Sequence, residues 1–280
     1  MTVRIVTDST CDLPSSVLDS LRISMVPVDV IRDGRPYKDG VDISHDELYR
    51  LLGQSKEAPT TAAPPPARFA ETYERLAEET DGIVSLHLTS EHSAVCDVAR
   101  RARENLGRPC TIQVMDSRSI SMGLGMLVMD AAEAANRGAS LKEVVQLVER
   151  EIPMIRAHAA FNTMRYLALG GRVNKVVGSV GAVLSIRLLL AIRDGRLRPA
   201  GFARTYPRAI DRLLLLTEQL GRIAEWSVVY STDRGQAEEV AERMARICPR
   251  GRVPITRLGP ALGVHAGPGA IAVVAKVQAS

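Results

Sequence analysis

The segment Val3-Arg4-Ile5-Val6-Thr7-Asp8-Ser9-Thr10 opens the chain with a short apolar run that ends in a cluster of small polar residues. Two further apolar runs, at 83–88 and 112–115, end in the same way, and helical periodicity follows each of the three. Alternation of strand and helix indicates parallel strands joined by crossover helices. The first half of the chain is therefore predicted to be an α/β unit built on a parallel sheet.

Other local signals mark helix starts and one loop. Ser44 with Glu47, and Ser140 with Glu143, have the spacing of a capping box, in which each side chain bonds an amide left open at a helix start. Residues 58–66 read APTTAAPPP. Because proline lacks an amide donor and restricts the residue before it, this stretch is predicted to be a rigid irregular loop.

The pattern changes in the second half of the chain. Residues 156–161 and 186–192 are predicted strands, and a short helix between them is predicted to end at Gly170-Gly171. Asp194-Gly195 follows the second of these strands, and Asp-Gly between apolar runs indicates a hairpin with antiparallel pairing. We therefore predict two α/β domains, an N-terminal one with a parallel sheet at 1–152 and a C-terminal one with mostly antiparallel strands at 153–280.

Composition narrows the class of protein. The 280 residues are 46% hydrophobic, which is enough for one large core or two ordinary ones. The four cysteines are scattered without metal-ligand spacing, so reduced thiols are expected rather than zinc or disulfides. No basic leader precedes the first strand, and no apolar run reaches the ~18 residues of a membrane span, so a cytoplasmic protein without a membrane segment is expected.

The net charge of +4 rests on arginines, several of them between Arg187 and Arg212. Nucleic-acid binding would need a recognised module or aromatic residues for base stacking, and aromatic residues make up 4% of the chain. A solvated basic face is the simpler interpretation, and no nucleic-acid partner is predicted.

Three polar clusters stand where a strand passes into a helix, which is where open parallel sheets bind ligands. Ser, Thr and Asp are also ordinary helix caps, so capping explains each cluster alone equally well. The clusters are Thr7-Asp8-Ser9-Thr10, Thr89-Ser90-Glu91-His92-Ser93 and Asp116-Ser117-Arg118-Ser119. Later in the chain, His265 precedes a Gly-Pro-Gly turn, where glycine lets the backbone approach a ligand closely. Gly170-Gly171-Arg172 is predicted to end a helix, and its arginine is either an ordinary surface residue or one whose planar fork binds a carboxylate.

Taken together, these segments resemble the DegV family of fatty-acid-binding proteins over nearly the whole chain. The matching segments of the first half are VTDSTCDLP at 6–14, DG at 33–34, YKDGVDI at 37–43, PTT at 59–61, SLHLTS at 85–90 with Ser93, DSR at 116–118 and SMGLG at 121–125. Those of the second half are GGR at 170–172, DG at 194–195, Arg204 and HAGPGA at 265–270.

The resemblance implies a two-domain fold with an acyl chain between the domains, and a carrier rather than an enzyme. The residues implied to bind the ligand, by their positions in the family motifs, are Thr61, Ser93, His265, Arg172, Arg204, Thr60 and Ala94. The first three form the implied carboxylate cluster, whereas the two arginines contact either the carboxylate or a partner protein. The implied ligand is a long-chain fatty acid such as palmitate, stearate or oleate, with no cofactor and no metal. The implied partner is a separate fatty acid kinase, which makes an acyl phosphate for phospholipid synthesis.

The chain departs from the family pattern at two places. The family loop usually has Thr-Ser-Gln-Pro-Ser, whereas here Thr61 is followed by Ala62-Ala63-Pro64-Pro65. After Ser93 the usual Gly-Thr-Tyr is Ala94-Val95-Cys96. A hydroxyl and an amide are therefore missing beside the implied carboxylate cluster, whose threonine, serine and histidine are all present.

Elementary energetics agree with the implied role. A buried carboxylate is costly unless it accepts hydrogen bonds, and hydroxyl, imidazole or guanidinium donors meet that need. At ~0.8 kcal/mol per buried CH₂, a chain of about sixteen carbons contributes on the order of 12 kcal/mol before ordering costs. The tail is therefore expected to supply the affinity, and the head group the orientation.

Other interpretations remain open from the residues alone. Asp8 after an apolar strand is similar to the nucleophile of phosphotransferases that form an aspartyl phosphate, but the second acid expected two residues on is Thr10. Ser93 and His265 could form a hydrolase pair oriented by Asp116, but no G-x-S-x-G surrounds the serine. The third alternative is a small-molecule sensor or a structural protein whose basic face binds a macromolecule. Residues 176–190 offer apolar side chains for a tunnel wall, although ordinary core packing explains them equally well.

Overall fold

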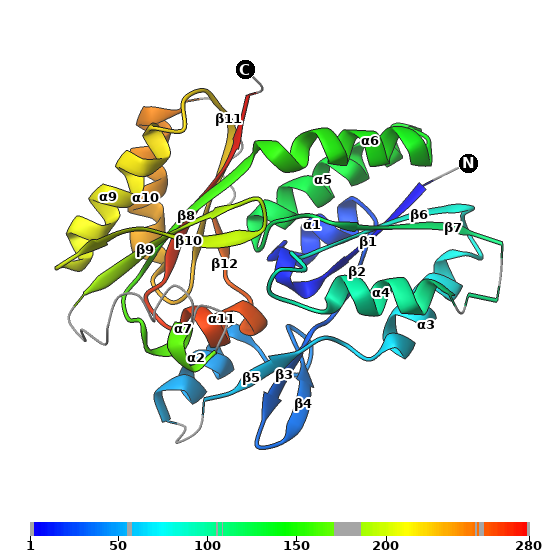
Figure 1. Cartoon of the computed structure of the whole chain (residues 1–280), viewed down its shortest axis with the longest axis horizontal. Helices are drawn as coiled ribbons and strands as arrows, with labels where there is room; N and C mark the ends of the chain where they lie inside the picture. The colour runs from blue at the N-terminus through cyan, green and yellow to red at the C-terminus, as the bar shows by residue number, and fades with distance from the viewer. Residues whose placement is uncertain are drawn as a thin grey trace.

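The computed structural model describes residues 3–54, 58–104, 106–107, 109–170, 186–249, 251 and 255–278. Two large sheets lie next to each other, one with helices on both faces and the other with helices on one face, and a small third sheet lies below them in the view of Figure 1. The predicted α/β class is confirmed.

The N-terminal sheet is parallel. Its strands are β1 (Val3–Asp8), β2 (Ile23–Val26), β6 (Gly82–His87) and β7 (Thr111–Asp116), in the order β2-β1-β6-β7. Helices α3 (Pro66–Leu76) and α4 (Val95–Glu104) pack on one face, and α5 (Met122–Asn136) and α6 (Leu141–Glu151) pack on the other (Figure 1). Every residue of β6 is buried, as expected for a strand that helices cover on both sides.

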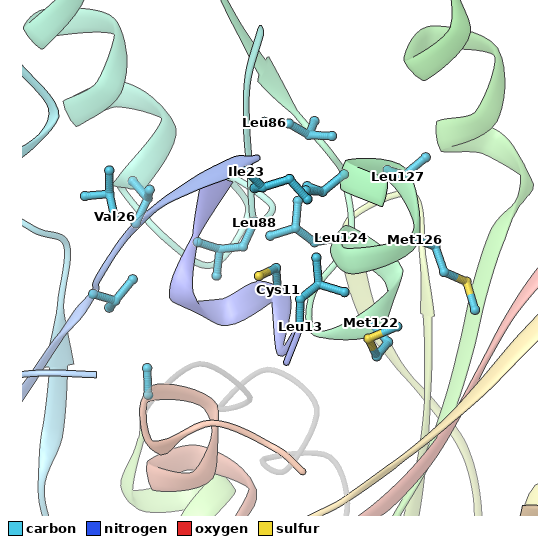
Figure 2. Close-up of a cluster of buried hydrophobic side chains, with 14 of the residues drawn as sticks. Cys11, Leu13, Ile23, Val26, Leu86, Leu88, Met122, Leu124, Met126 and Leu127 are labelled. Carbon is cyan, nitrogen blue, oxygen red and sulfur yellow. The ribbon is translucent and has the colours of Figure 1, made fainter. Parts of the chain in front are cut away.

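A short turn after β1 is held firmly in the core. It comprises η1 (Ser9–Cys11) and leads to α1 (Ser15–Ser20). In Figure 2 the side chains of Cys11 and Leu13 lie beside Leu124 and Met122 of α5, and all four are buried. Helix α5 is apolar nearly all round, which is typical of a helix enclosed by other elements. This apolar packing against α5 therefore holds the turn, and with it the polar residues Ser9 and Thr10, in place.

The small sheet corrects one prediction. Strands β3 (Asp29–Arg32), β4 (Arg35–Lys38) and β5 (Thr60–Ala62) pair antiparallel in the order β4-β3-β5, and α2 (His45–Gln54) lies between β4 and β5 in the chain. The prediction that 58–66 is wholly irregular is wrong, because 60–62 form β5 and Pro66 begins α3. The prolines fall outside the three paired residues, and proline at the first helical position loses no hydrogen bond.

Both predicted helix starts are found. Ser140 and Glu143 form the full capping box at the start of α6. At α2, the Ser44 hydroxyl accepts a hydrogen bond from the Glu47 amide at 3.2 Å. Local side-chain chemistry thus sets where these two helices begin.

The C-terminal sheet is mostly antiparallel, as predicted. Its order is β10-β9-β8-β13-β11-β12, and only the β11–β12 pair among these described strands is parallel. The strands are β8 (Ile155–Phe161), β9 (Arg187–Arg193), β10 (Arg196–Ala203), β11 (Ile223–Tyr230), β12 (Ile255–Arg257) and β13 (Ile271–Val277). Asp194 and Gly195 join β9 to β10 with φ of 53° and 79°, the left-handed conformation that a tight hairpin turn requires.

Helices cover one face of this sheet. Helices α9 (Tyr206–Glu218) and α10 (Arg234–Ile247) pack against it through an apolar cluster around Trp226 and Leu213 (Figure 1). Three short elements complete the chain: η2 (Ile152–Met154), α7 (Arg165–Leu169) and α11 (Pro260–Ala266). The sheet's other face is turned toward the N-terminal half.

Residues from both halves meet in one apolar cluster, which includes Leu86 of β6 and Ala159 of β8. Lys276 of β13 adds ion pairs with Asp130 at 2.9 Å and Glu151 at 2.7 Å. A division into domains at 1–152 and 153–280 stays a prediction. No helix in the described ranges has both the length and the apolar character needed to cross a bilayer.

Candidate ligand-binding site

A cavity of about 360 Å³ lies between the face of the C-terminal sheet that α9 and α10 leave uncovered and the strand ends of the N-terminal sheet. On β8, Ala157, Ala159 and Phe161 line it, because alternate residues of a strand point to the same side. Leu190 and Ile192 of β9 stand opposite Ala159 and Ala157 in the strand register and line it too. This wall is continuous and apolar.

The rest of the wall is also mainly apolar. It comes from the loops of the N-terminal half and from α11, and its apolar members include Val28, Leu88, Ile120, Leu258, Leu262 and Ala266. Small side chains on the sheet, such as Ala157, Ala159 and Ala272, leave the space that larger residues would fill. Such a cavity suits an extended apolar ligand.

Polar side chains gather at one part of this wall. Thr61 Oγ1 on β5 and His265 Nε2 near the end of α11 are 2.8 Å apart and hydrogen-bonded. Both residues line the cavity, although 204 positions separate them in the chain. Gly170 allows the imidazole this place, because a Cβ there would lie 2.1 Å from His265 Nδ1. The close approach of the imidazole gives a physical reason for glycine at position 170, which the sequence indicated only as a helix end.

Ser93 contributes a second hydroxyl at the start of α4. Its Oγ accepts a hydrogen bond from the Val95 amide at 3.3 Å, a bond that does not use the hydroxyl proton. Ser93 lines the cavity together with Ala94 and His92. The positive end of the α4 dipole therefore lies near this hydroxyl and favours negative charge there.

The structure brings together four of the seven residues that the sequence indicated: Thr61, Ser93, Ala94 and His265 all line one cavity. Thr60 is exposed on β5 and is not part of the wall. Arg204 is exposed after the edge strand β10, away from the cavity lining. Arg172 lies outside the described residues, as do 176–185 of the apolar stretch once considered for the wall.

Three buried acids lie behind the cavity, and sequence reasoning assigned no role to two of them, Asp12 and Asp39. Thr10 and Ser121 line the cavity, and their hydroxyls donate to Asp8 and Asp12 respectively. Asp39 is the third acid of the group and accepts a hydrogen bond from Ser9 at 2.8 Å. Burial raises the pKa of Asp12 to about 8 and that of Asp39 to about 7. These acids lie in the segments 6–14 and 37–43, which match the family motifs, and this match was the sequence signal that could have pointed to them.

Asp8 is fully engaged in structural hydrogen bonds. One carboxylate oxygen accepts from the amide and hydroxyl of Thr10, and the other meets His87 Nδ1 at 3.0 Å and the Leu88 amide at 3.1 Å. Its side chain is completely buried. Within the described ranges, no group of three His, Cys, Asp or Glu residues has the geometry to hold a metal ion. The geometry gives no support to an aspartyl-phosphate role for Asp8.

A serine, a histidine and an aspartate do line up in the order of a hydrolase triad. Ser85 Oγ is 2.7 Å from His87 Nε2, and His87 Nδ1 is 3.0 Å from Asp8. Ser85 is nevertheless fully buried, bonds the Tyr73 hydroxyl at 2.7 Å, and does not line the cavity, so a substrate has no access to it. At the cavity itself, His265 Nε2 meets Thr61 rather than Ser93.

Fold and cavity define an α/β binding protein whose internal apolar cavity is polar at one part of its wall. The chain belongs to the DegV family: the model of this family of uncharacterised proteins matches residues 2–277. A DegV domain-containing protein of Caldanaerobacter subterraneus subsp. tengcongensis is 35% identical over 278 residues, 97% of each chain. One from Streptomyces coelicolor is 34% identical over 281 residues, again 97% of each chain.

Solved structures share the whole fold. A DegV family protein from Thermus thermophilus, described by its fatty acid binding, is 29% identical with a TM-score of 0.91, covering 99% of this chain and 100% of that chain. A Thermotoga maritima protein described as revealing a fatty acid binding function is 25% identical with a TM-score of 0.83, covering 99% and 100%. The complete architecture described above is thus common to these proteins.

Proposed function

We propose that this chain binds one long-chain fatty acid in the cavity, with its acyl chain against the C-terminal sheet and its carboxylate at Thr61, Ser93 and His265. The observation that carries the proposal is the hydrogen-bonded Thr61–His265 pair in the wall of an otherwise apolar cavity. Apolar ligands without a polar end would not need this pair, and small polar ligands would not need the apolar wall.

Each part of the cavity has a separate task in this proposal. The wall from β8, β9 and β13 removes the tail from water, which supplies most of the binding free energy. In this arrangement the His265 imidazole donates to Thr61 Oγ1, and the hydroxyl protons of Thr61 and Ser93 donate to the carboxylate and compensate its lost hydration. The α4 dipole adds a favourable field at Ser93. The head group therefore fixes the direction in which the acid lies.

The known DegV structures support this proposal. The Thermus thermophilus protein, which shares the complete fold, is described by its fatty acid binding. The Thermotoga maritima protein is described in the same terms at a similar level of identity. A carrier of a fatty acid is therefore the function that both the cavity and these relatives favour.

The finer part of the proposal is that the bound acid is presented to a separate fatty acid kinase in the cytoplasm. A carboxylate oxygen of the acid would attack the γ-phosphorus of ATP, forming the acyl phosphate while the bond to the β-phosphate oxygen breaks and ADP leaves. The carrier contributes an oriented carboxylate and no catalytic group. The acyl phosphate would then serve phospholipid synthesis. Exposed Arg204 is suited to contact the kinase rather than the lipid.

Mass spectrometry of the purified protein, first under native and then under denaturing conditions, tests the binding step. We expect one bound small molecule that is released on unfolding, with a mass matching a fatty acid of roughly C14 to C18, the length whose burial supplies the affinity. Empty protein that also fails to take up added fatty acid would contradict the proposal. Protein unfolded and refolded without lipid serves as the control for uptake.

The kinase step needs its own test. Protein loaded with radiolabelled fatty acid is mixed with ATP and with the fatty acid kinase of the same organism, and acyl phosphate is trapped as the hydroxamate with hydroxylamine. We expect hydroxamate only when protein, lipid, ATP and kinase are all present. Hydroxamate formed without kinase would instead make this chain an enzyme.

A further inference from the structure

Helix α11 connects the buried acids to the cavity. At its beginning, the amide of Gly259 donates to Asp12 at 2.8 Å, and Asp39 accepts a hydrogen bond from the backbone of Ala261. At its other end, His265 meets Thr61 in the cavity wall. The helix has seven residues and, at about 1.5 Å per residue, is about 10 Å long. A displacement of its beginning should therefore also displace His265 near its other end.

The two acids lie close to the residue that precedes α11. A Cβ on Gly259 would lie 2.9 Å from one oxygen of Asp12 and 3.6 Å from both oxygens of Asp39. Both carboxylates therefore pack directly against the backbone that starts the helix. Because carboxylates that accept amide hydrogen bonds stabilise the first turn of a helix, the two acids fix this end of α11.

Both acids are themselves fixed by the N-terminal half. Asp12 accepts from Ser121 at the start of α5. Asp39 accepts from Ser9, whose hydroxyl oxygen also accepts from the Val28 amide at 3.0 Å. The anchor of α11 therefore belongs to the N-terminal half, whereas the helix lies in the C-terminal part of the chain.

We propose that Asp12 and Asp39 are positioning residues for His265: they anchor the beginning of α11 to the N-terminal half and thereby set where the imidazole stands in the cavity. Neither acid lines the cavity, so neither contacts a ligand directly. Asp12 also holds Ser121 of the cavity wall, whereas Asp39 is connected to the cavity through α11, and the test below therefore uses Asp39. As a statement about lipid binding, the inference rests on the proposed function. As a statement about the imidazole, it can be tested on protein without any ligand.

The protonation of Asp12 and Asp39 gives the proposal a measurable pH dependence. Burial is the main cause that raises the pKa of Asp12 to about 8 and that of Asp39 to about 7, and each is raised further by neighbouring carboxylates. Protonation weakens a carboxyl group as an acceptor of amide hydrogen bonds. The titratable groups that face the pair from the surrounding elements are Asp8, Cys11, Tyr49 and, beside Tyr49, Arg257. Burial raises the pKa of the Cys11 thiol and that of the Tyr49 phenol above their ordinary values, so neither of these two groups becomes charged in the range in which the two acids titrate.

The same pKa values fix the direction of a stability effect. Both acids have folded-state pKa values above the ordinary value near about 4. Their contribution to stability is therefore fully present below about pH 4 and is lost as the pH rises through about 7 to 8. We expect the Tm of the native protein to fall between pH 6 and 9 relative to that of the variant Asp12→Asn/Asp39→Asn, in which neither group titrates.

The deciding experiment follows the His265 imidazole by NMR in lipid-free protein, with His265→Gln to assign its signals. The variants are Asp39→Ala, Asp39→Asn and, as a matched control, Asp33→Asn in the exposed β3–β4 turn. We expect Asp39→Ala to move the His265 signals and to weaken fatty acid binding about tenfold, the effect of leaving a buried amide without its acceptor. Asp39→Asn should restore both, because its amide oxygen still accepts.

The pH titration of the same signals decides the matter if Asp39→Ala does not fold. In the native protein we expect the His265 signals to show an inflection that comes from the titration of the acids. Asp12→Asn/Asp39→Asn should lose this inflection, and Asp33→Asn should keep it. Unchanged His265 signals in Asp39→Ala, or the same pH profile in the double variant as in the native protein, would overturn the proposal. Wild-type protein that binds no fatty acid would refute the proposed function and leave this test valid.

Discussion

The two large sheets contribute different kinds of side chain to the cavity, polar ones from the N-terminal sheet and apolar ones from the C-terminal sheet. The parallel N-terminal sheet sends loops from its strand ends, and these loops carry hydroxyls such as those of Thr10, Ser93 and Ser121. The antiparallel C-terminal sheet presents a flat face of apolar residues such as Ala159 and Leu190. One sheet borders the cavity with the loops at its strand ends, and the other borders it with one of its faces.

Topology explains this difference. In a parallel sheet the carboxyl ends of all strands lie on the same side. The loops that follow these ends therefore bring together polar groups from distant segments of the chain. In the antiparallel C-terminal sheet, α9 and α10 cover one face only. The other face is also apolar and forms a continuous wall of the cavity. Orientation of the ligand should therefore depend on the N-terminal loops, and affinity on the C-terminal sheet.

The largest loss should come from filling the apolar wall. Ala159→Phe places a ring where the ligand's chain is expected, opposite Leu190 and Ala272. Displacing about four methylene groups costs about 3 kcal/mol, or on the order of 100-fold in Kd. Isothermal titration with palmitate measures it, and Ala67→Phe on the exposed side of α3 is the control. Equal affinity of Ala159→Phe and wild type would place the acyl chain elsewhere.

A smaller loss is expected from the head-group end. His265→Ala removes the imidazole that holds the Thr61 hydroxyl toward the carboxylate. A hydrogen bond to a charged group contributes about 1.5–3 kcal/mol, so palmitate should bind about 10- to 100-fold more weakly. Hexadecanol, which carries no charge, should lose much less. If acid and alcohol weaken equally, the histidine acts on the cavity's shape rather than on the carboxylate.

Ser93→Ala should change orientation more than occupancy. The hydroxyl is one of several donors, and its removal costs about 1 kcal/mol, or about fivefold in Kd. The rate of kinase-dependent acyl phosphate formation at saturating lipid should fall by more than that, because the carboxylate is less firmly held. Ser90→Ala, in the same loop but bonded to Asp116, is the control. Phosphorylation equal to wild type would remove Ser93 from the site.

Much of the fold could be predicted because its signals are local. The strands of the parallel sheet, the capping box at Ser140 and the hairpin at Asp194 each depend on residues a few positions apart. Strand β5 could not be predicted, since it is three residues long, lies between prolines and exists only because it pairs with β3. Helix α11 was missed for a similar reason, as its beginning depends on acids at positions 12 and 39.

The candidate site shows the same limit more strongly. Spacing in the chain does not reveal that Thr61 and His265 meet, because 204 residues separate them. The family motifs supplied that pairing, along with Ser93. The motifs did not say what Asp12 does, since its partner Gly259 is 247 positions away and contributes only its backbone. Positions in such motifs indicate that a residue matters, and only the fold gives the physical reason.

The smallest effect on the lipid should come from Arg204, which lies on neither side of the cavity. Its side chain is exposed beyond β10, and surface substitutions change stability by no more than about 0.5 kcal/mol, so Arg204→Ala should alter palmitate affinity by less than about twofold. If this arginine faces the kinase, the rate of acyl phosphate formation should fall while lipid occupancy stays constant, and should fall less in Arg208→Ala, which removes the same charge from exposed α9. Higher kinase concentration should restore the rate, because a docking residue acts on the encounter of two proteins. Loss of lipid in Arg204→Ala would instead mean that the basic edge of the C-terminal sheet belongs to the binding cavity, and this sheet would then contribute a polar group as well as an apolar wall.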